Sequence, residues 1–141
     1  MPSVHPVELC IGLARAQAAV VRQFDRRLGT LHGISLGDFI VLWNLARAEG
    51  GKLRRMDLAA EVGVTASAVT RTLIPLERIG LVVRQPDPRD ARVGYAVLTR
   101  AGRRLLDDAM VSAEVSAEDA LAGIKRGERE ALFAMLAHLA R

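Results

Sequence analysis

The side chains best equipped for chemistry in this chain are arginines gathered in its middle. Residues 52–104 carry eleven basic groups, ten of them arginine, against five acidic groups, which gives a net charge of +6. Residues 1–51 carry +1 and residues 105–141 carry −3. A guanidinium group donates paired hydrogen bonds to phosphate oxygens, or to O6 and N7 of guanine. The block is therefore typical of a polyanion-binding module, although a solvated arginine-rich surface gives the same count.

Two short helices separated by a glycine turn are predicted inside this basic block. Leu58, Ala59 and Val62 have helical spacing, and Gly63 suits the left-handed backbone that ends a helix. Thr65 then has the position of an N-cap for a second helix. This second helix is predicted to turn Val69, Leu73 and Leu76 inward, and Ser67, Thr70, Arg71, Ile74 and Arg78 outward. Two short helices joined in this way are a helix-turn-helix.

A β-hairpin is predicted to follow the second helix. Residues 81–83 and 95–98 are apolar enough for two strands, and residues 85–94 between them hold two prolines and a glycine. The fold class is therefore mainly α with a small β-hairpin wing, a winged helix-turn-helix. Pro75 lies within the second helix, where we expect a kink near Ile74 and a continuation to about Ile79.

Longer helices are predicted on both sides of the winged element, at residues 5–31, 36–48, 100–122 and 128–140. Ser35 and Thr99 are the predicted N-caps of the second and third of these helices. The first helix has apolar residues on more than one side, which requires more packing partners than a small monomer offers. We therefore expect the terminal helices to form a dimerisation region, with a monomer packed on its own core as the alternative.

The segment from about residue 35 to residue 107 resembles the core of the MarR (multiple antibiotic resistance regulator) family. The resemblance rests on the helix-turn-helix and on three motifs that follow it in order: L-E-x-x-G-L (Leu76, Glu77, Gly80, Leu81), Asp90-x-Arg92, and L-T-x-x-G (Leu98, Thr99, Gly102). It implies a homodimeric transcriptional regulator, usually a repressor that a small ligand or oxidation releases. The expected regions are an N-terminal dimerisation helix (1–34), a DNA-binding winged helix-turn-helix (35–99) and C-terminal dimerisation helices (100–141).

The predicted DNA contacts follow from how a recognition helix presents its N-terminal residues to the major groove. Arg71 is expected to read guanine, Ser67 to donate or accept a hydrogen bond, and Ala68 to touch a thymine methyl group, with Thr70 beside them. An ion pair of Arg71 with Glu77 or Asp87 is the alternative.

The wing and the residues before the helix-turn-helix supply further predicted contacts. Arg89 and Arg92 are expected to enter a narrow minor groove, with Asp90 as a support for the wing. Lys52, Arg54 and Arg55 are predicted phosphate clamps, with a plain solvated cluster as the alternative. A two-fold dimer would read an inverted repeat in double-stranded DNA.

The sequence indicates less about the ligand or oxidant that would release the protein from DNA than about the DNA contacts. The resemblance places ligands between the dimer helices and the winged lobe, where Arg15, His32, Trp43 and Arg47 are candidate contacts for a small inducer, with phenolic acids as the class to test. Trp43 also fits a plain core position. Cys10 lies where a peroxide-sensing branch of the family carries a reactive cysteine, so a thiol-based repressor is an alternative. The partner tyrosines of that branch are missing, and an inert apolar Cys10 is the simpler interpretation.

Other classes of function are disfavoured by composition. The histidines are scattered, and no metal-ligand spacing, phosphate-binding glycine loop or nucleophile motif occurs, so we expect no enzyme, metal or cofactor. No apolar run reaches about 18 residues and no signal peptide is recognisable, which predicts a cytoplasmic protein without a membrane partner. A winged helix that binds another protein is the last alternative. It is disfavoured because aromatic anchors are scarce, at 4% of the residues.

Overall fold

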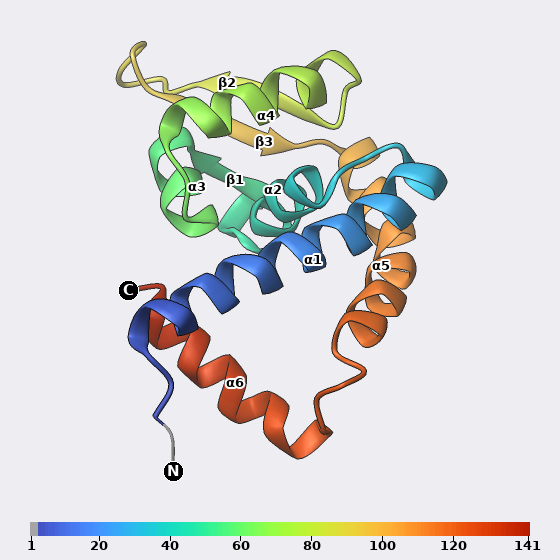
Figure 1. The fold of residues 1–141 in the computed structure, drawn as a ribbon. Coiled ribbons are helices and arrows are strands. Elements are labelled where there is room, and N and C mark those ends of the chain that lie inside the picture. Colours follow the sequence, from blue (N-terminus) through green and yellow to red (C-terminus); the bar gives the residue numbers. More distant parts are fainter. Residues whose placement is uncertain (1–2) are drawn as a thin grey trace.

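The computed structural model describes residues 3–141, which form a mainly helical molecule with one small sheet at the end that also holds the two helices of the predicted helix-turn-helix (Figure 1). The helices are α1 (Pro6–His32), α2 (Leu36–Arg47), α3 (Arg55–Val62), α4 (Ala66–Arg78), α5 (Arg100–Ala120) and α6 (Arg126–Leu139), and a short 3-10 turn, η1 (Glu49–Gly51), follows α2. The strands are β1 (Lys52–Arg54), β2 (Val82–Pro86) and β3 (Gly94–Leu98). The predicted class, mainly helical with a small β wing, is confirmed.

The predicted N-caps are confirmed by hydrogen bonds at three helix starts. Ser35 accepts from the backbone N–H of Asp38 at 3.0 Å, and the Asp38 carboxylate accepts from the N–H of Ser35, which completes a capping box. Thr65 Oγ1 accepts from Ala68 at 3.1 Å and Thr99 Oγ1 accepts from Gly102 at 3.0 Å. Each cap satisfies a backbone donor that would otherwise lack a partner, so the local sequence fixes where α2, α4 and α5 begin.

The helix-turn-helix consists of α3 and α4, joined by residues 63–65. Gly63 has φ of 79°, a left-handed conformation that L-amino acids with side chains rarely adopt, and this lets the chain reverse after Val62. Helix α4 continues through Pro75 to Arg78, close to the predicted end at Ile79.

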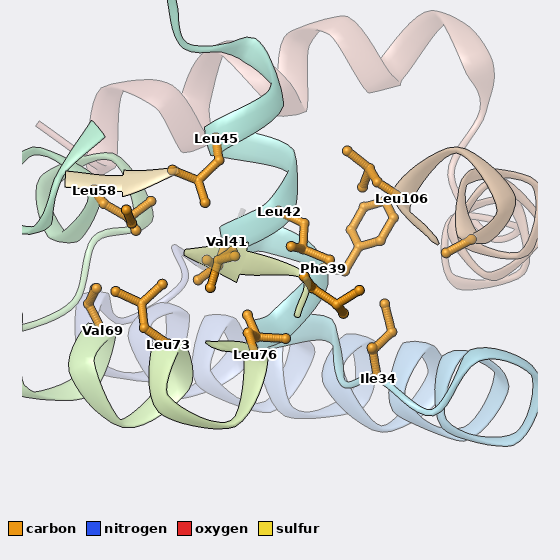
Figure 2. Packing of buried hydrophobic residues seen from close by; sticks show 14 of the residues in the cluster. Ile34, Phe39, Val41, Leu42, Leu45, Leu58, Val69, Leu73, Leu76 and Leu106 are labelled. Carbon is orange, nitrogen blue, oxygen red and sulfur yellow. The ribbon is translucent and has the colours of Figure 1, made fainter. Parts of the chain in front are cut away.

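The hydrophobic core is centred on α2, which packs against the helix-turn-helix on one side, and it continues to Leu28 of α1 and Leu106 of α5 (Figure 2). Leu42 and Leu45 of α2 are fully buried, and α4 contributes Val69, Leu73 and Leu76, the inward set that its sequence predicts. Burial of each such side chain stabilises the fold by about 1.5–3 kcal/mol. The core therefore holds α4 by one face and leaves its other face to solvent.

The sheet has three antiparallel strands in the order β1-β3-β2, so the prediction of a plain hairpin missed β1. Strand β1 pairs with β3 in a register that sets Arg54 opposite Tyr95. Three residues with a single apolar side chain are too few to give an alternating pattern, so this strand is defined by its partner rather than by its own sequence.

Strand β2 is longer than predicted and ends at Pro86 rather than Val83. Pro86 lacks a backbone N–H, but β2 is an edge strand, where a missing donor costs little. Residues 87–93 therefore form the wing tip in place of the predicted 85–94.

The terminal helices leave the winged lobe and extend to the opposite end of the molecule (Figure 1). Helix α1 packs along α5, yet only Leu28 of α1 is buried. Helix α6 has no buried residue, and it begins at Arg126, two residues before the predicted start at residue 128. Among the described residues 3–141, no helix combines the length and apolar character that a membrane span requires.

Candidate nucleic-acid interface

Helix α4 presents its predicted base-reading residues at its N-terminal half. Ser67 and Arg71 are exposed, and Ala68 and Thr70 are half-buried at the edge of the same face. Inward packing of Val69 and Leu73 fixes this orientation, since residues one or two positions away on a helix point elsewhere. Figure 1 places α4 and the wing together at the end of the molecule remote from α6.

The guanidinium of Arg71 is uncommitted in this structure. Among residues 3–141, none of the side-chain hydrogen bonds or ion pairs includes it. The two carboxylates considered as its alternative partners are engaged elsewhere, Glu77 with Arg55 and Asp87 with Arg54. Arg71 therefore keeps its donors available for an external acceptor.

Arg55 lies at the start of α3 and reaches across to α4. Its guanidinium donates to Thr70 Oγ1 at 3.5 Å and lies 3.7 Å from a carboxylate oxygen of Glu77. A half-exposed pair of this kind contributes about 0–1 kcal/mol. Arg55 thus holds the two helices of the motif together, and this contact limits its freedom to act as the predicted phosphate clamp.

Arg54 belongs to a cluster at the base of the wing. Its Nε donates to the Tyr95 hydroxyl at 3.3 Å, and its Nη2 lies 3.6 Å from Asp87 Oδ2. The hydrogen bond to Tyr95 is the main cause that raises the pKa of Arg54 above its ordinary value. The ammonium group of Lys52 lies 5.0 Å from the centre of the Tyr95 ring, a cation–π distance. Lys52 and Arg54 therefore both contact the side chain of Tyr95.

The wing tip is shaped by hydrogen bonds that the carboxylates of Asp90 and Asp87 accept from backbone N–H groups. Asp90 Oδ1 accepts from the backbone N–H of Arg92 at 3.0 Å and from its Nε at 3.2 Å. These two bonds hold the pKa of Asp90 below its ordinary value. Asp87 Oδ1 accepts from the backbone N–H of Arg89 at 2.8 Å. The Arg92 side chain is 92% exposed and Arg89 is also exposed, so both guanidinium groups project into solvent.

The candidate inducer residues do not form one site. Arg47 lies over the ring of Trp43, with 5.1 Å from its guanidinium carbon to the ring centre, and Trp43 stacks near Phe39. His32 instead hydrogen bonds to Ser112 of α5 at 2.8 Å. Arg15 is exposed on α1, and no hydrogen bond, ion pair or ring contact within residues 3–141 joins it to the other three. Trp43 is 37% exposed, so it lies at the surface of α2 rather than deep in the core.

Cys10 is an exposed free thiol on α1. None of the hydrogen bonds within residues 3–141 includes its sulfur, and Tyr95, the one tyrosine of the chain, belongs to the Arg54 cluster on the winged lobe. In the same described residues, no group of three or more His, Cys, Asp or Glu side chains is placed to hold a metal ion.

Sequence reasoning missed the roles of Tyr95, Asp87 and Glu77. The sequence indicates only that Tyr95 belongs to a strand and that Asp87 and Glu77 are alternative partners for Arg71. The β1–β3 register brings Arg54 to Tyr95, so prediction of β1 would have revealed the cluster. No local sequence pattern marks Asp87 as the partner of Arg54 and Tyr95, which lie on other segments of the chain.

The chain is similar in sequence to known proteins. A model of the MarR family matches residues 32–93. The chain is 31% identical over 134 residues to a protein of Thauera aromatica that is named as a transcriptional regulatory protein for the hcr operon. The aligned region covers 95% of this chain and 80% of that relative.

Solved structures share the whole fold. A MarR family transcriptional regulator from Streptomyces coelicolor, in complex with DNA, superposes with a TM-score of 0.86 at 22% identity, covering 99% of this chain and 90% of that one. NadR in complex with 4-hydroxyphenylacetate superposes with a TM-score of 0.78 at 28% identity, covering 100% and 99%.

Proposed function

Because the chain belongs to the MarR family of DNA-binding transcriptional regulators, we propose that it acts as a homodimeric repressor on an inverted repeat in double-stranded DNA. The observation that carries this proposal is the uncommitted Arg71 on the exposed face of α4, with Arg89 and Arg92 exposed on the adjacent wing. Arg71 and Ser67 read base edges in the major groove, and the wing arginines occupy the minor groove.

The dimer is supported by apolar side chains that the monomer leaves in water. On α6, Phe133 is 75% exposed, and Met135, Leu136 and Leu139 are exposed as well. The start of α1 adds Val7, Leu9 and Ile11. Soluble monomers rarely expose so many large apolar side chains on their terminal helices. A second copy of the same chain, related by a two-fold axis, would cover them. That axis sets two α4 helices against half-sites about one helical turn apart.

DNA binding and dimerisation are tested together on the purified full chain. Light scattering is expected to give twice the 15.3 kDa of one chain. Binding to random duplex is expected to fall by about 10³-fold or more between 50 and 200 mM salt, if a dimer neutralises roughly six phosphates. A protein that is monomeric and binds no duplex at low salt contradicts the proposal. Salt-insensitive capture of a protein instead supports the protein-interaction alternative.

Release by a small aromatic acid is the proposed signal. Support comes from NadR, which is similar in fold and binds 4-hydroxyphenylacetate, and from Trp43, whose partly exposed ring lies beside the Arg47 guanidinium. An indole ring stacks on an aromatic ligand, and a guanidinium group pairs with its carboxylate. His32 and Arg15 are proposed as outer contacts, brought closer to such a ligand by the second subunit.

Trp43 also supplies the readout, because it is the one tryptophan of the chain. Titration with 4-hydroxyphenylacetate is expected to change its fluorescence, to raise the melting temperature and to release the bound duplex. Ligand at 100 times its dissociation constant adds about 2.7 kcal/mol of stability. An unchanged melting temperature at millimolar ligand contradicts this inducer class and leaves DNA binding untouched.

A further inference from the structure

Asp87 is the most enclosed carboxylate among the ion pairs of the winged lobe. Its side chain is 10% exposed, and its oxygens face three groups from three segments: Arg54 of β1, the Tyr95 hydroxyl of β3 at 3.4 Å, and the backbone N–H of Arg89 at 2.8 Å. Its own backbone N–H donates to Val93 across the tip at 2.9 Å. One residue thus joins β1, β3 and both sides of the wing.

A carboxylate at this place opposes the binding of a polyanion. It repels phosphates, and it also occupies Arg54, which otherwise would neutralise one. Arg54 further donates to Tyr95, so its guanidinium is held by two partners on the wing base. The cluster of Arg54, Asp87 and Tyr95 lowers the electrostatic attraction to DNA of any sequence. Its contribution to binding is therefore the position that it gives to the wing.

We propose that Asp87 and Tyr95 are positioning residues for DNA recognition, which fix the wing base to β1 so that Arg89 and Arg92 meet the minor groove while Arg71 lies in the major groove. The inference rests on the proposed function. Asp87 thereby lowers the affinity of the protein for DNA of any sequence and raises its affinity for the recognised sequence. The Asp87 carboxylate orders the peptide that carries Arg89 and withholds Arg54 from the phosphates.

The test compares Asp87→Asn with Asp57→Asn. Asp57 is exposed in the first turn of α3, has a weaker electrostatic effect on Arg54 than Asp87 has, and takes part in none of the side-chain hydrogen bonds or ion pairs of residues 3–141. Both variants remove one negative charge near the interface, but only Asp87→Asn removes the counter-ion of Arg54. The probes are a duplex selected from a random library by the wild-type protein and a random duplex of equal length.

Asp87→Asn is expected to lose about tenfold in affinity for the selected duplex. On random duplex its plot of log K against log salt is expected to steepen by about one unit, since Arg54 becomes free to neutralise one more phosphate. Asp57→Asn is expected to bind both duplexes slightly more tightly with an unchanged slope. Misfolding does not produce this combination, because it weakens binding to both duplexes and adds no phosphate contact.

Tyr95→Phe is the second variant, and it keeps the test decisive if Asp87→Asn fails to fold. It retains the ring beneath Lys52 and removes only the hydroxyl between Arg54 and Asp87, so a smaller selective loss on the selected duplex is expected. The inference is overturned if Asp87→Asn behaves like Asp57→Asn, or if either cluster variant loses both duplexes equally. Failure of the wild-type protein to bind duplex contradicts the proposed function instead.

Discussion

The hydroxyl of Thr99 lies 2.6 Å from the carbonyl oxygen of Gly80, and this hydrogen bond joins the start of α5 to the turn that ends α4. The hydroxyl oxygen of Thr99 also caps α5, because it accepts from the backbone N–H of Gly102. The backbone N–H of Thr99 also donates to the Leu81 carbonyl at 3.1 Å. The helix that leads towards the proposed dimer region is therefore fastened directly to the exit of the recognition helix.

Gly102→Ala is expected to loosen this junction. A Cβ at Gly102 would overlap the carbonyl oxygen of Leu81 and would lie 2.7 Å from Cδ1 of Leu98, so backbone must move. We expect a loss of roughly 1–3 kcal/mol of unfolding free energy, the usual cost of overpacking, measured by denaturant titration. Gly29→Ala is the control, because nothing lies within 4 Å of its Cβ position and alanine favours a helix interior. Equal stability of the two variants would disprove the close contact.

Arg71→Ala is expected to lose discrimination while the protein stays dimeric. A bidentate arginine–guanine contact contributes about 1–3 kcal/mol of selectivity, so affinity for the selected duplex should fall by roughly 5- to 150-fold and affinity for random duplex much less. Fluorescence anisotropy on both duplexes measures the two losses. Arg78→Ala, at the other end of α4, is the matched control. Equal losses of Arg71→Ala on both duplexes would assign Arg71 to the phosphate contacts.

Arg92→Ala is expected to weaken binding mainly where the flanks of the site are rich in A·T pairs. The narrow minor groove of such flanks has an enhanced negative potential, and the Arg92 side chain is almost fully exposed. Hydroxyl-radical footprints of the wild-type and variant proteins on AT-rich and GC-rich flanks measure the effect. Protection at AT-rich flanks that persists in the variant would reject the minor-groove contact.

The sequence predicts those features of the fold that depend on neighbouring residues. Ser35, Thr65 and Thr99 each cap a helix by accepting from the backbone N–H three residues later, and Val69, Leu73 and Leu76 follow the period of a single helix. Such signals are local, so composition and spacing reveal them.

The remaining features depend on pairing between distant segments. Strand β1 forms only by pairing with β3, and Arg54 hydrogen bonds to Tyr95, which lies 41 residues later in the chain. The sequence predicts Arg55 as a phosphate clamp, whereas in the fold its guanidinium contacts Thr70 and Glu77. Sequence therefore locates the arginines of the candidate interface, and the structure separates those that are free from those that are engaged.

Cys10→Ser is expected to leave the response to organic peroxide unchanged. A thiol reacts quickly when a neighbouring group stabilises the thiolate, and Cys10 has no hydrogen-bond partner within residues 3–141. Release of the selected duplex by cumene hydroperoxide, in the wild-type protein and in the variant, is the measurement. Rapid release from the wild-type protein beside an unresponsive variant would establish the thiol-based sensor instead.

Phe133→Asp is expected to separate the proposed dimer without unfolding the subunit. Phe133 is 75% exposed and α6 buries no residue within the chain, so a charge there costs a monomer less than about 0.5 kcal/mol. In a dimer the same charge would be buried without a partner, which costs several kcal/mol. Light scattering should give the mass of one chain, with an unchanged far-ultraviolet spectrum, and affinity for the selected duplex should fall with the loss of the second half-site. Phe133→Leu keeps the surface apolar and should remain dimeric. If Phe133→Asp remains a dimer, the two-fold contact must lie on another part of the terminal helices.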